Sequence, residues 1–150
     1  MIQIWYHLDM RLITRNTDYA VRALSYISRQ KGKVVSVSGL VKELKMPRPF
    51  LRKILQALNK EGLLKSYKGS GGGFSLDRPG NKIFLFDLIK ALQGPIKFNE
   101  CIFKKGFCPD IKSCALKKKI EAIERYVVRQ LQSITIASLC AKGCAEGKTC

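Results

Sequence analysis

The stretch VSGLVKELKMPRPFLRKILQALNKEGLLKSYKGSGGGFSL, residues 37–76, decides the fold of this chain. Apolar residues recur at helical spacing over residues 37–44 and again over residues 48–61. The turn Lys45-Met46-Pro47 separates these two runs. The pattern therefore predicts two short helices that are joined by a tight turn.

Two short apolar runs follow the second of these helices, at residues 63–67 and 74–76, and a glycine-rich loop over residues 68–73 lies between them. Short apolar runs around such a loop are typical of a β-hairpin. The loop does not match a dinucleotide-binding pattern, because Phe74 stands where the sixth-position glycine is needed. Two helices, a tight turn and a hairpin predict a winged helix-turn-helix: a mainly α-helical fold with a small β-hairpin wing.

Three more helices are expected outside this stretch. One precedes it, over residues 17–30, and a short one follows it, over residues 86–93. A long helix over residues 115–139 has apolar residues at steps of four, three, four, four and three, which is a heptad-like seam suited to pairing with another helix. The seam consists of Leu116, Ile120, Ile123, Val127, Leu131 and Ile134. We expect the chain to form a homodimer through this helix.

These elements divide the chain into five parts. Residues 1–9 are expected to be an extension before the natural start. Residues 10–94 are expected to form the winged-helix DNA-binding domain, and residues 95–114 are expected to form a cysteine-containing loop. Residues 115–139 form the dimerisation helix, and residues 140–150 are a flexible tail that carries cysteines.

The net charge of the chain indicates what kind of molecule it binds. The 150 residues include 28 Lys and Arg against 11 Asp and Glu, a net charge of +17, which indicates a polyanionic partner. No run of roughly 18 apolar residues exists, so no membrane span is expected. Residues 1–9 do not form a secretory signal, so we expect the chain in the cytoplasm. His7 is the only histidine, which excludes sites that need two.

The residues expected to bind double-stranded DNA lie on the second helix of the pair and on the wing. Side chains at every fourth position of a helix share one face, and a helix in the major groove presents that face to the bases. Wing glycines allow the backbone to approach phosphate closely, and lysines bind it. A solvated basic face is the alternative interpretation. The expected set is Arg48, Arg52, Lys53, Gln56, Lys65, Lys68, Gly71 and Gly72.

In several stretches the chain resembles the IscR/NsrR-type regulators of the Rrf superfamily, which are winged-helix transcription regulators. The similar stretches are residues 10–14, 17–24, 69–74, 94–95 and 133–137. The resemblance implies a homodimer that binds a palindromic operator as a repressor. It also implies that the chain is not an enzyme, and the sequence agrees in having no C-x-x-C motif and no βαβ pattern.

Three cysteines in the loop, Cys101, Cys108 and Cys114, have the spacing C-x6-C-x5-C. Three thiolates at this spacing can converge on a metal or cluster, and nearby lysines favour the thiolate form. The spacing alone leaves three free thiols equally open. The resemblance implies an iron–sulfur cluster, either [2Fe–2S] or [4Fe–4S], because cluster-binding members carry three cysteines here.

Three thiolates leave a four-ligand site one ligand short. In the IscR-like branch a histidine follows the last cysteine by three residues, but Lys117 stands there. In the NsrR-like branch an aspartate comes from the first helix of the partner subunit, and Asp18 occupies the matching position. The resemblance therefore implies Asp18 as the fourth ligand, and a helix-capping or helix-dipole role for Asp18 is the alternative.

A second triplet, Cys140, Cys144 and Cys150, lies in the tail. We expect free thiols on a frayed segment there, with a second metal site as the alternative. Together these features predict a transcription regulator whose operator affinity depends on an iron–sulfur cluster that senses nitric oxide, redox state or cluster status. The alternative is a cluster-free winged-helix regulator that is controlled by a protein partner or by thiol oxidation.

Overall fold

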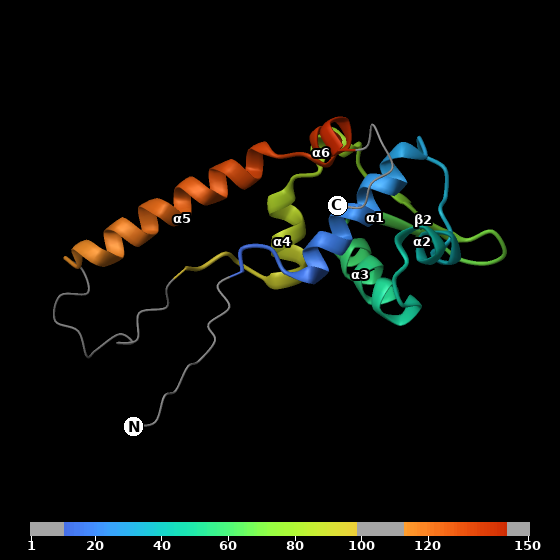
Figure 1. The fold of residues 1–150 in the computed structure, drawn as a ribbon, viewed down its shortest axis with the longest axis horizontal. Helices are drawn as coiled ribbons and strands as arrows, with labels where there is room; N and C mark the ends of the chain where they lie inside the picture. Colours follow the sequence, from blue (N-terminus) through green and yellow to red (C-terminus); the bar gives the residue numbers. More distant parts are fainter. Residues whose placement is uncertain (1–10, 99–112, 144–150) are drawn as a thin grey trace, which may run out of the picture.

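The structure of the chain is a computed structural model that describes residues 11–98 and 113–143 (Figure 1). It is mainly helical, with one two-stranded antiparallel sheet among the described residues. The predicted fold class is therefore confirmed. In chain order the elements are α1 (Arg15–Arg29), α2 (Val37–Leu44), α3 (Arg48–Lys60), β1 (Leu64–Tyr67), β2 (Gly73–Leu76), the 3-10 helix η1 (Gly80–Lys82), α4 (Leu85–Gln93), α5 (Ala115–Ser133) and α6 (Ile136–Gly143).

The turn between α2 and α3 is fixed by local chemistry at both ends. The Ser36 hydroxyl caps α2 by accepting a hydrogen bond from the Gly39 N–H at 3.0 Å. Lys45 ends α2 in the left-handed region, with φ 51°, which turns the chain sharply. Pro47 then precedes α3, and the buried Met46 anchors the turn to the core. The helix-turn-helix geometry follows from this cap, the left-handed Lys45, the proline and the buried methionine.

The hairpin is held in register by the core as well as by its own ladder. Leu64 pairs with Leu76 at its base, and Tyr67 pairs with Gly73 near its tip. Val35 adds a short bridge on the outer side of β2, where it exchanges two backbone hydrogen bonds of 2.8 Å with Phe74. This third segment anchors the wing to the chain just before α2.

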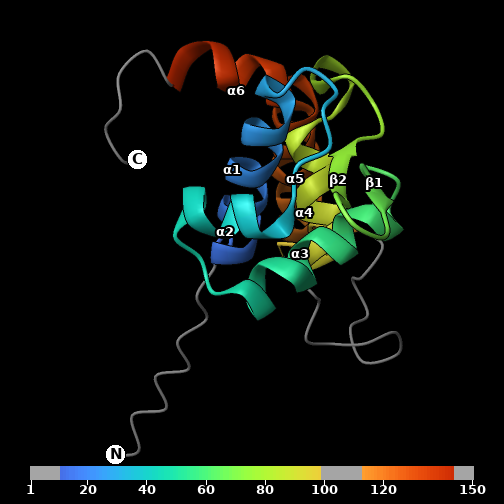
Figure 2. The same cartoon turned by 90° about the vertical axis from the view of Figure 1, so that its right-hand side faces the viewer.

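The hydrophobic core lies between α1, α3 and the base of the hairpin. Its fully buried side chains come from every one of these elements, which explains why the helices and the wing have fixed relative positions. They include Ala20, Ala23, Leu24, Ile27, Leu40, Leu51, Leu55, Leu58, Leu63 and Leu64. The view in Figure 2 shows α2, α3 and the hairpin on one side of the molecule, with α5 behind them.

The prediction of one continuous helix over residues 115–139 is wrong. Helix α5 ends at Ser133 because the chain then becomes extended, and Thr135 forms an antiparallel bridge with Phe84. The Leu85 N–H donates to the Ile134 carbonyl at 2.9 Å, which secures this break. The four-three spacing of apolar residues runs through Ile134 without interruption, so periodicity could not reveal the break.

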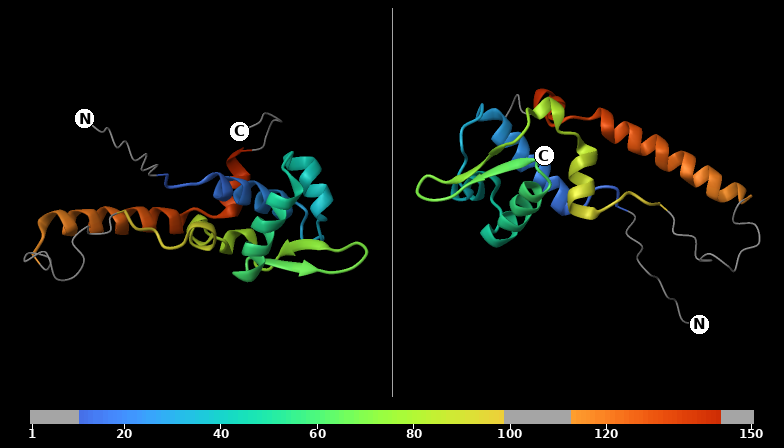
Figure 3. Two further views of the ribbon diagram at one scale, coloured as in Figure 1. Left: turned by 90° about the horizontal axis from the view of Figure 1, so that it is seen from below. Right: turned by 180° about the vertical axis from the view of Figure 1, so that it is seen from behind.

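Helix α5 and the hairpin project in opposite directions from the rest of the fold (Figures 1 and 3). The C-terminal half of α5 lies beside α4, while its N-terminal half extends away from the described core (Figure 1). Within residues 11–98 and 113–143, no helix is both long enough and apolar enough to span a bilayer.

Candidate nucleic-acid interface

A groove of about 580 Å³ lies where α3, the hairpin and the start of α2 meet. The elements that line it, α2, α3 and the hairpin, lie toward the viewer in Figure 2. Its lining residues share two properties: nearly all are polar or glycine, and none is acidic. They are Ser36, Val37, Ser38, Arg48, Arg52, Gln56, Asn59, Ser66, Tyr67, Lys68, Gly69, Gly72, Gly73 and Phe74.

Helix α3 supplies one wall of the groove. Leu51 and Leu55 are fully buried on its inner face, and this burial fixes the rotation of the helix. Arg48, Arg52 and Gln56 are consequently exposed on another face, and all three line the groove. The structure therefore brings together the three side chains that helical spacing placed on one face.

The wing supplies the opposite wall. Lys68 is exposed at the start of the loop and lines the groove with Gly72. A side chain at Gly72 would overlap the Tyr67 carbonyl oxygen and would lie 2.9 Å from that of Gly69. Gly71 has φ +79°, which only glycine adopts readily, and space is open around it. These two glycines therefore allow a tight turn, and they place no side chain on its surface.

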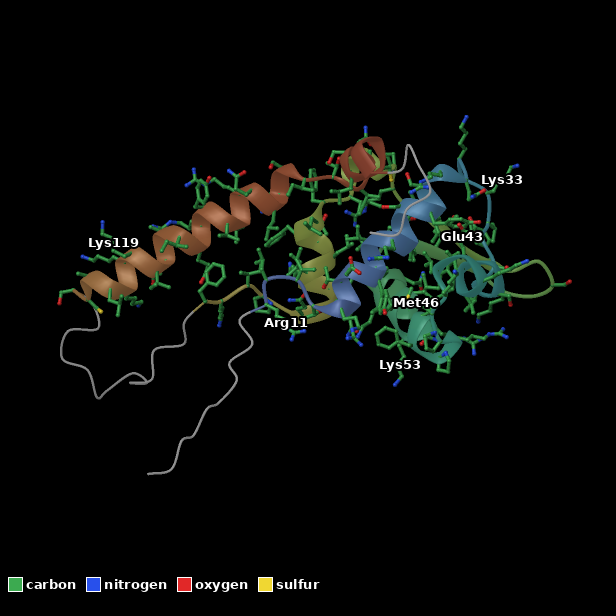
Figure 4. All side chains as sticks on the ribbon, viewed as in Figure 1. Arg11, Lys33, Glu43, Met46, Lys53 and Lys119 are labelled. Atoms are coloured by element: carbon green, nitrogen blue, oxygen red, sulfur yellow. The ribbon has the colours of Figure 1, made fainter. Side chains whose placement is uncertain are left out.

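Two predicted lysines lie outside the groove. Lys53 is exposed on α3 and points away from the body of the molecule (Figure 4). Lys65 forms an ion pair with Asp77, with 3.1 Å between Nζ and Oδ1. Hydrogen bonding to the Asp77 carboxylate, and then its negative charge, raise the pKa of Lys65. Lys65 is therefore held in an ion pair in the strand that forms the base of the wing.

The groove also contains polar residues that the sequence interpretation left out. Asn59 joins its two walls, because its side-chain amide donates to the Leu64 carbonyl at 2.7 Å. Asn59 lies three residues after Gln56, so helical spacing puts it on the same side of α3, although it was not among the residues expected to bind DNA. Ser36 and Ser38 lie at the start of α2 and also line the groove.

The cysteine residues are only partly covered by the structure. Cys101 and Cys108 lie outside the described residues. Cys114 caps α5, where its sulfur accepts a hydrogen bond from the Lys117 N–H at 3.4 Å. The positive end of a helix attracts negative charge, so this position suits an anionic ligand. Within residues 11–98 and 113–143, no three Cys, His, Asp or Glu side chains gather closely enough to hold a metal.

Asp18 lies in the first turn of α1 and forms an ion pair with Arg22, with 3.1 Å between Oδ2 and Nε. Both side chains are about half exposed. In one chain, α1 begins near the body of the molecule, while the Cys114 end of α5 is at its far extremity (Figure 1). The structure of one chain therefore does not bring Asp18 to Cys114.

The tail begins later than predicted. Residues 140–143 continue helix α6 instead of fraying, and the Cys140 thiol donates to the Ser25 carbonyl of α1 at a sulfur–oxygen distance of 3.7 Å. Cys140 packs against the core cluster, so a small apolar surface holds this end of the chain. Cys144 and Cys150 lie outside the described residues.

Comparison with known proteins gives a consistent family. The model of the Rrf2 family, described as iron-dependent transcriptional regulators, matches residues 13–142. A protein of Aquifex aeolicus (strain VF5) described as an HTH-type transcriptional regulator is 32% identical over 123 residues, which cover 81% of this chain and 85% of that protein. Protein aau3 of Rhizobium meliloti (strain 1021) is 35% identical over 132 residues, 87% of this chain and 84% of that protein.

Solved structures share the fold. CymR, the global cysteine regulator of B. subtilis, has a TM-score of 0.71 at 22% identity, with 88% of this chain and 98% of that chain covered. IscR of T. potens has a TM-score of 0.66 at 23% identity, with 94% and 96% covered. Because these sequence identities are low, the comparison with the two structures shows only that the fold is shared.

Proposed function

The chain belongs to the Rrf2 family of DNA-binding transcriptional regulators, and from this membership we propose that its groove between α3 and the wing binds the operator. One observation carries the proposal: the charged side chains that line the groove, Arg48, Arg52 and Lys68, are all cationic. Phosphates of double-stranded DNA attract such a surface, and arginine can also read guanine edges in the major groove. Gln56 adds a side chain able to pair with adenine.

A homodimer would place two such grooves on one DNA molecule. Leu116, Ile123 and Tyr126 are large and apolar, yet more than half of each is exposed along α5. A second copy of α5 is the partner that a heptad-like seam fits best. Two-fold symmetry then matches a palindromic operator, and binding there as a repressor blocks transcription.

The regulatory part of the proposal is an iron–sulfur cluster, [2Fe–2S] or [4Fe–4S], held by Cys101, Cys108 and Cys114. The family description as iron-dependent supports it. The position of Cys114 at the positive end of α5 is chemically suited to an anionic cluster ligand. When bound, a cluster supplies a centre that reacts with nitric oxide and with oxidants.

Asp18 is the proposed fourth ligand, donated by a second copy of the chain. In one chain α1 and the Cys114 end of α5 lie apart, so a ligand from the same chain is unfavourable (Figure 1). Its carboxylate already pairs with Arg22, and this pairing would compete with ligation and keep the bond to the cluster weak. A weakly held ligand is easily displaced, which suits a sensor.

Anaerobic purification tests the cluster proposal. We expect brown protein with iron and acid-labile sulfide, and loss of the colour when nitric oxide is added. Each of Cys101→Ala, Cys108→Ala and Cys114→Ala should be pale and should still fold, because side chains from the described part of the chain already form the core that holds the winged helix. Full colour and nitric oxide sensitivity in Cys108→Ala would show that the cluster assignment is wrong. Colourless wild-type protein that binds DNA would favour control by thiol oxidation or by a protein partner.

A further inference from the structure

The first turn of α1 is completed by a side chain from a distant part of the sequence. Oε1 of Gln93, the last residue of α4, accepts hydrogen bonds from the Thr14 N–H and hydroxyl at 3.1 Å each and from the Thr17 hydroxyl at 2.5 Å. The Gln93 amide nitrogen also donates to the Leu12 carbonyl at 3.4 Å. We refer to these contacts between Gln93 and residues 12–17 as the clasp.

The clasp replaces a contact that helices usually make locally. In a capping box, a glutamate or glutamine at the third helical position accepts the N–H of the capping residue. Here Thr17 occupies that position, and it is Gln93 that accepts the Thr14 N–H. Thr17 is fully buried, which makes its bond to Gln93 costly to lose. The start of α1 is thus fastened to the end of α4.

Each side of the clasp lies next to a part of the proposed sensor. Gln93 is followed directly by Gly94-Pro95 and so by the segment 95–114, which carries the three cysteines. On the other side, Asp18 directly follows the clasped Thr17. A change in the cysteine segment that pulls on the end of α4 therefore pulls on the turn that presents Asp18.

The residue that follows Asp18 in α1 contacts the helix that faces the groove. The Tyr19 ring meets the Phe50 ring of α3 edge to face, with centroids 5.6 Å apart and planes at 83°. Such ring pairs prefer a specific geometry, so they transmit a rotation of one helix to the next. Phe50 lies between Arg48 and Arg52 in the sequence, on the first turn of α3.

We propose that Gln93 is a positioning residue that couples the cysteine segment to the DNA-reading helix, through the clasp and then through the contact between Tyr19 and Phe50. This inference rests on the proposed function, because it takes the cysteine segment as the sensor and the groove as the DNA site. Gln93 does not line the groove, and the side-chain hydrogen bonds described for it go to residues 12–17. Its effect is on the difference between two DNA affinities.

The test compares operator affinity in the cluster-loaded and cluster-free forms of the full-length protein. The probe is a DNA duplex selected from a random-sequence pool by the two forms of the wild-type protein, and anisotropy gives each dissociation constant. Gln93→Ala should bring the ratio of the two constants closer to one by about 2- to 30-fold, the range found when coupling residues are changed. Gln93→Glu keeps the three acceptor contacts and should restore most of the ratio.

Two further variants separate coupling from a purely structural role. Phe50→Leu keeps an apolar side chain and removes the ring contact, so it should reduce the same ratio, and combining it with Gln93→Ala should add little. Gln132→Ala is the matched control, since Gln132 is exposed near the end of α5. If Gln93→Ala does not fold, Thr17→Val takes its place. This substitution removes one hydrogen-bond donor of the clasp and leaves the size of the side chain unchanged.

A second measurement does not need the cluster. In the cluster-free protein, Gln93→Ala should speed amide hydrogen exchange in the first turn of α1 and also in the first turn of α3, while α6 is unchanged. A folded, coloured Gln93→Ala protein with the wild-type ratio and unchanged exchange in α3 would overturn the inference. Colourless wild-type protein would instead contradict the proposed cluster, and the exchange measurement would still decide whether the clasp couples the two helices.

Discussion

The groove places side chains with different reach next to one another. Arg48 and Arg52 rise from a helix whose inner face is locked by buried leucines, whereas Lys68 belongs to a loop turned by glycines. A guanidinium on a rigid helix can meet a base edge with two parallel hydrogen bonds. An ammonium on a loop acts as a point charge and suits phosphate. The two kinds of residue should therefore differ in specificity rather than in strength alone.

Binding to operator and scrambled DNA should separate these roles. Arg48→Ala or Arg52→Ala should weaken operator binding more than binding to scrambled DNA, with a difference of about 1–3 kcal/mol for at least one of them. Lys68→Ala should weaken both equally, because phosphates carry no sequence information. Gel-shift titrations at one fixed salt concentration measure both effects.

A control outside the groove tests whether the loss of any positive charge weakens DNA binding. Lys90→Ala removes a positive charge from α4, at an exposed position that does not line the groove. Lys90→Ala should change both affinities only slightly. Equal losses on the two DNA molecules for both arginine variants would contradict base reading by this face.

Among the elements, α5 has two halves with different surroundings. Leu131 is buried against Leu85 and Ile89 of α4, and Val127 packs beside them. Leu116 and Ile123, nearer the N-terminus of α5, are largely exposed in the single chain. The heptad-like seam therefore serves the fold of one chain at its C-terminal end and is available to a second chain at its N-terminal end.

Substitutions in the two halves should have separate effects. Leu116→Asp combined with Ile123→Asp should give a folded monomer by light scattering, because it places charge on a surface that only a partner covers. Leu131→Ala should lower the free energy of unfolding by about 2–5 kcal/mol, since it leaves a cavity between α4 and α5. A folded dimer in the double aspartate variant would refute the assigned interface.

The sequence predicts those elements whose signals are local. The starts of α2 and α3 match the prediction at Val37 and Arg48, because a serine cap and a proline mark them in the sequence. The end of α5 was missed because Thr135 leaves the helix to pair with Phe84, a partner that is distant in sequence. Tertiary pairing of this kind overrides helical periodicity, and no local signal announces it.

The candidate site divides in the same way. Arg48, Arg52 and Gln56 follow from helical spacing alone, and the structure places all three in the groove. The pairing of Lys65 with Asp77 and the clasp of Gln93 on Thr14 both join residues from separate elements. Such contacts depend on how elements pack, which composition and spacing do not encode.

At the scale of the whole molecule, the wing and the Cys114 end of α5 lie at opposite extremities (Figures 1 and 3). A sensor at one extremity can control the other only through the body of the chain or through a second copy. If Asp18 comes from a second copy, each cluster bridges two chains, and ligand exchange at one site changes the geometry of the dimer. The arrangement of ligands across the dimer is therefore the property to test.

Mixed dimers test this arrangement. In a dimer of one Asp18→Ala copy and one Cys114→Ala copy, ligation across chains leaves one site complete, built from the cysteines of the first copy and Asp18 of the second, while the other site lacks both groups. Ligation within a chain leaves no complete site. We therefore expect mixed dimers, isolated with two different affinity tags, to hold about half of the wild-type cluster with wild-type stability toward nitric oxide.

Pure Asp18→Ala dimers should assemble clusters that decay faster, and pure Cys114→Ala dimers should be pale. Absorption and iron content after anaerobic reconstitution measure all three, and mixed dimers whose clusters all decay as fast as those of pure Asp18→Ala dimers would show that Asp18 does not act across chains.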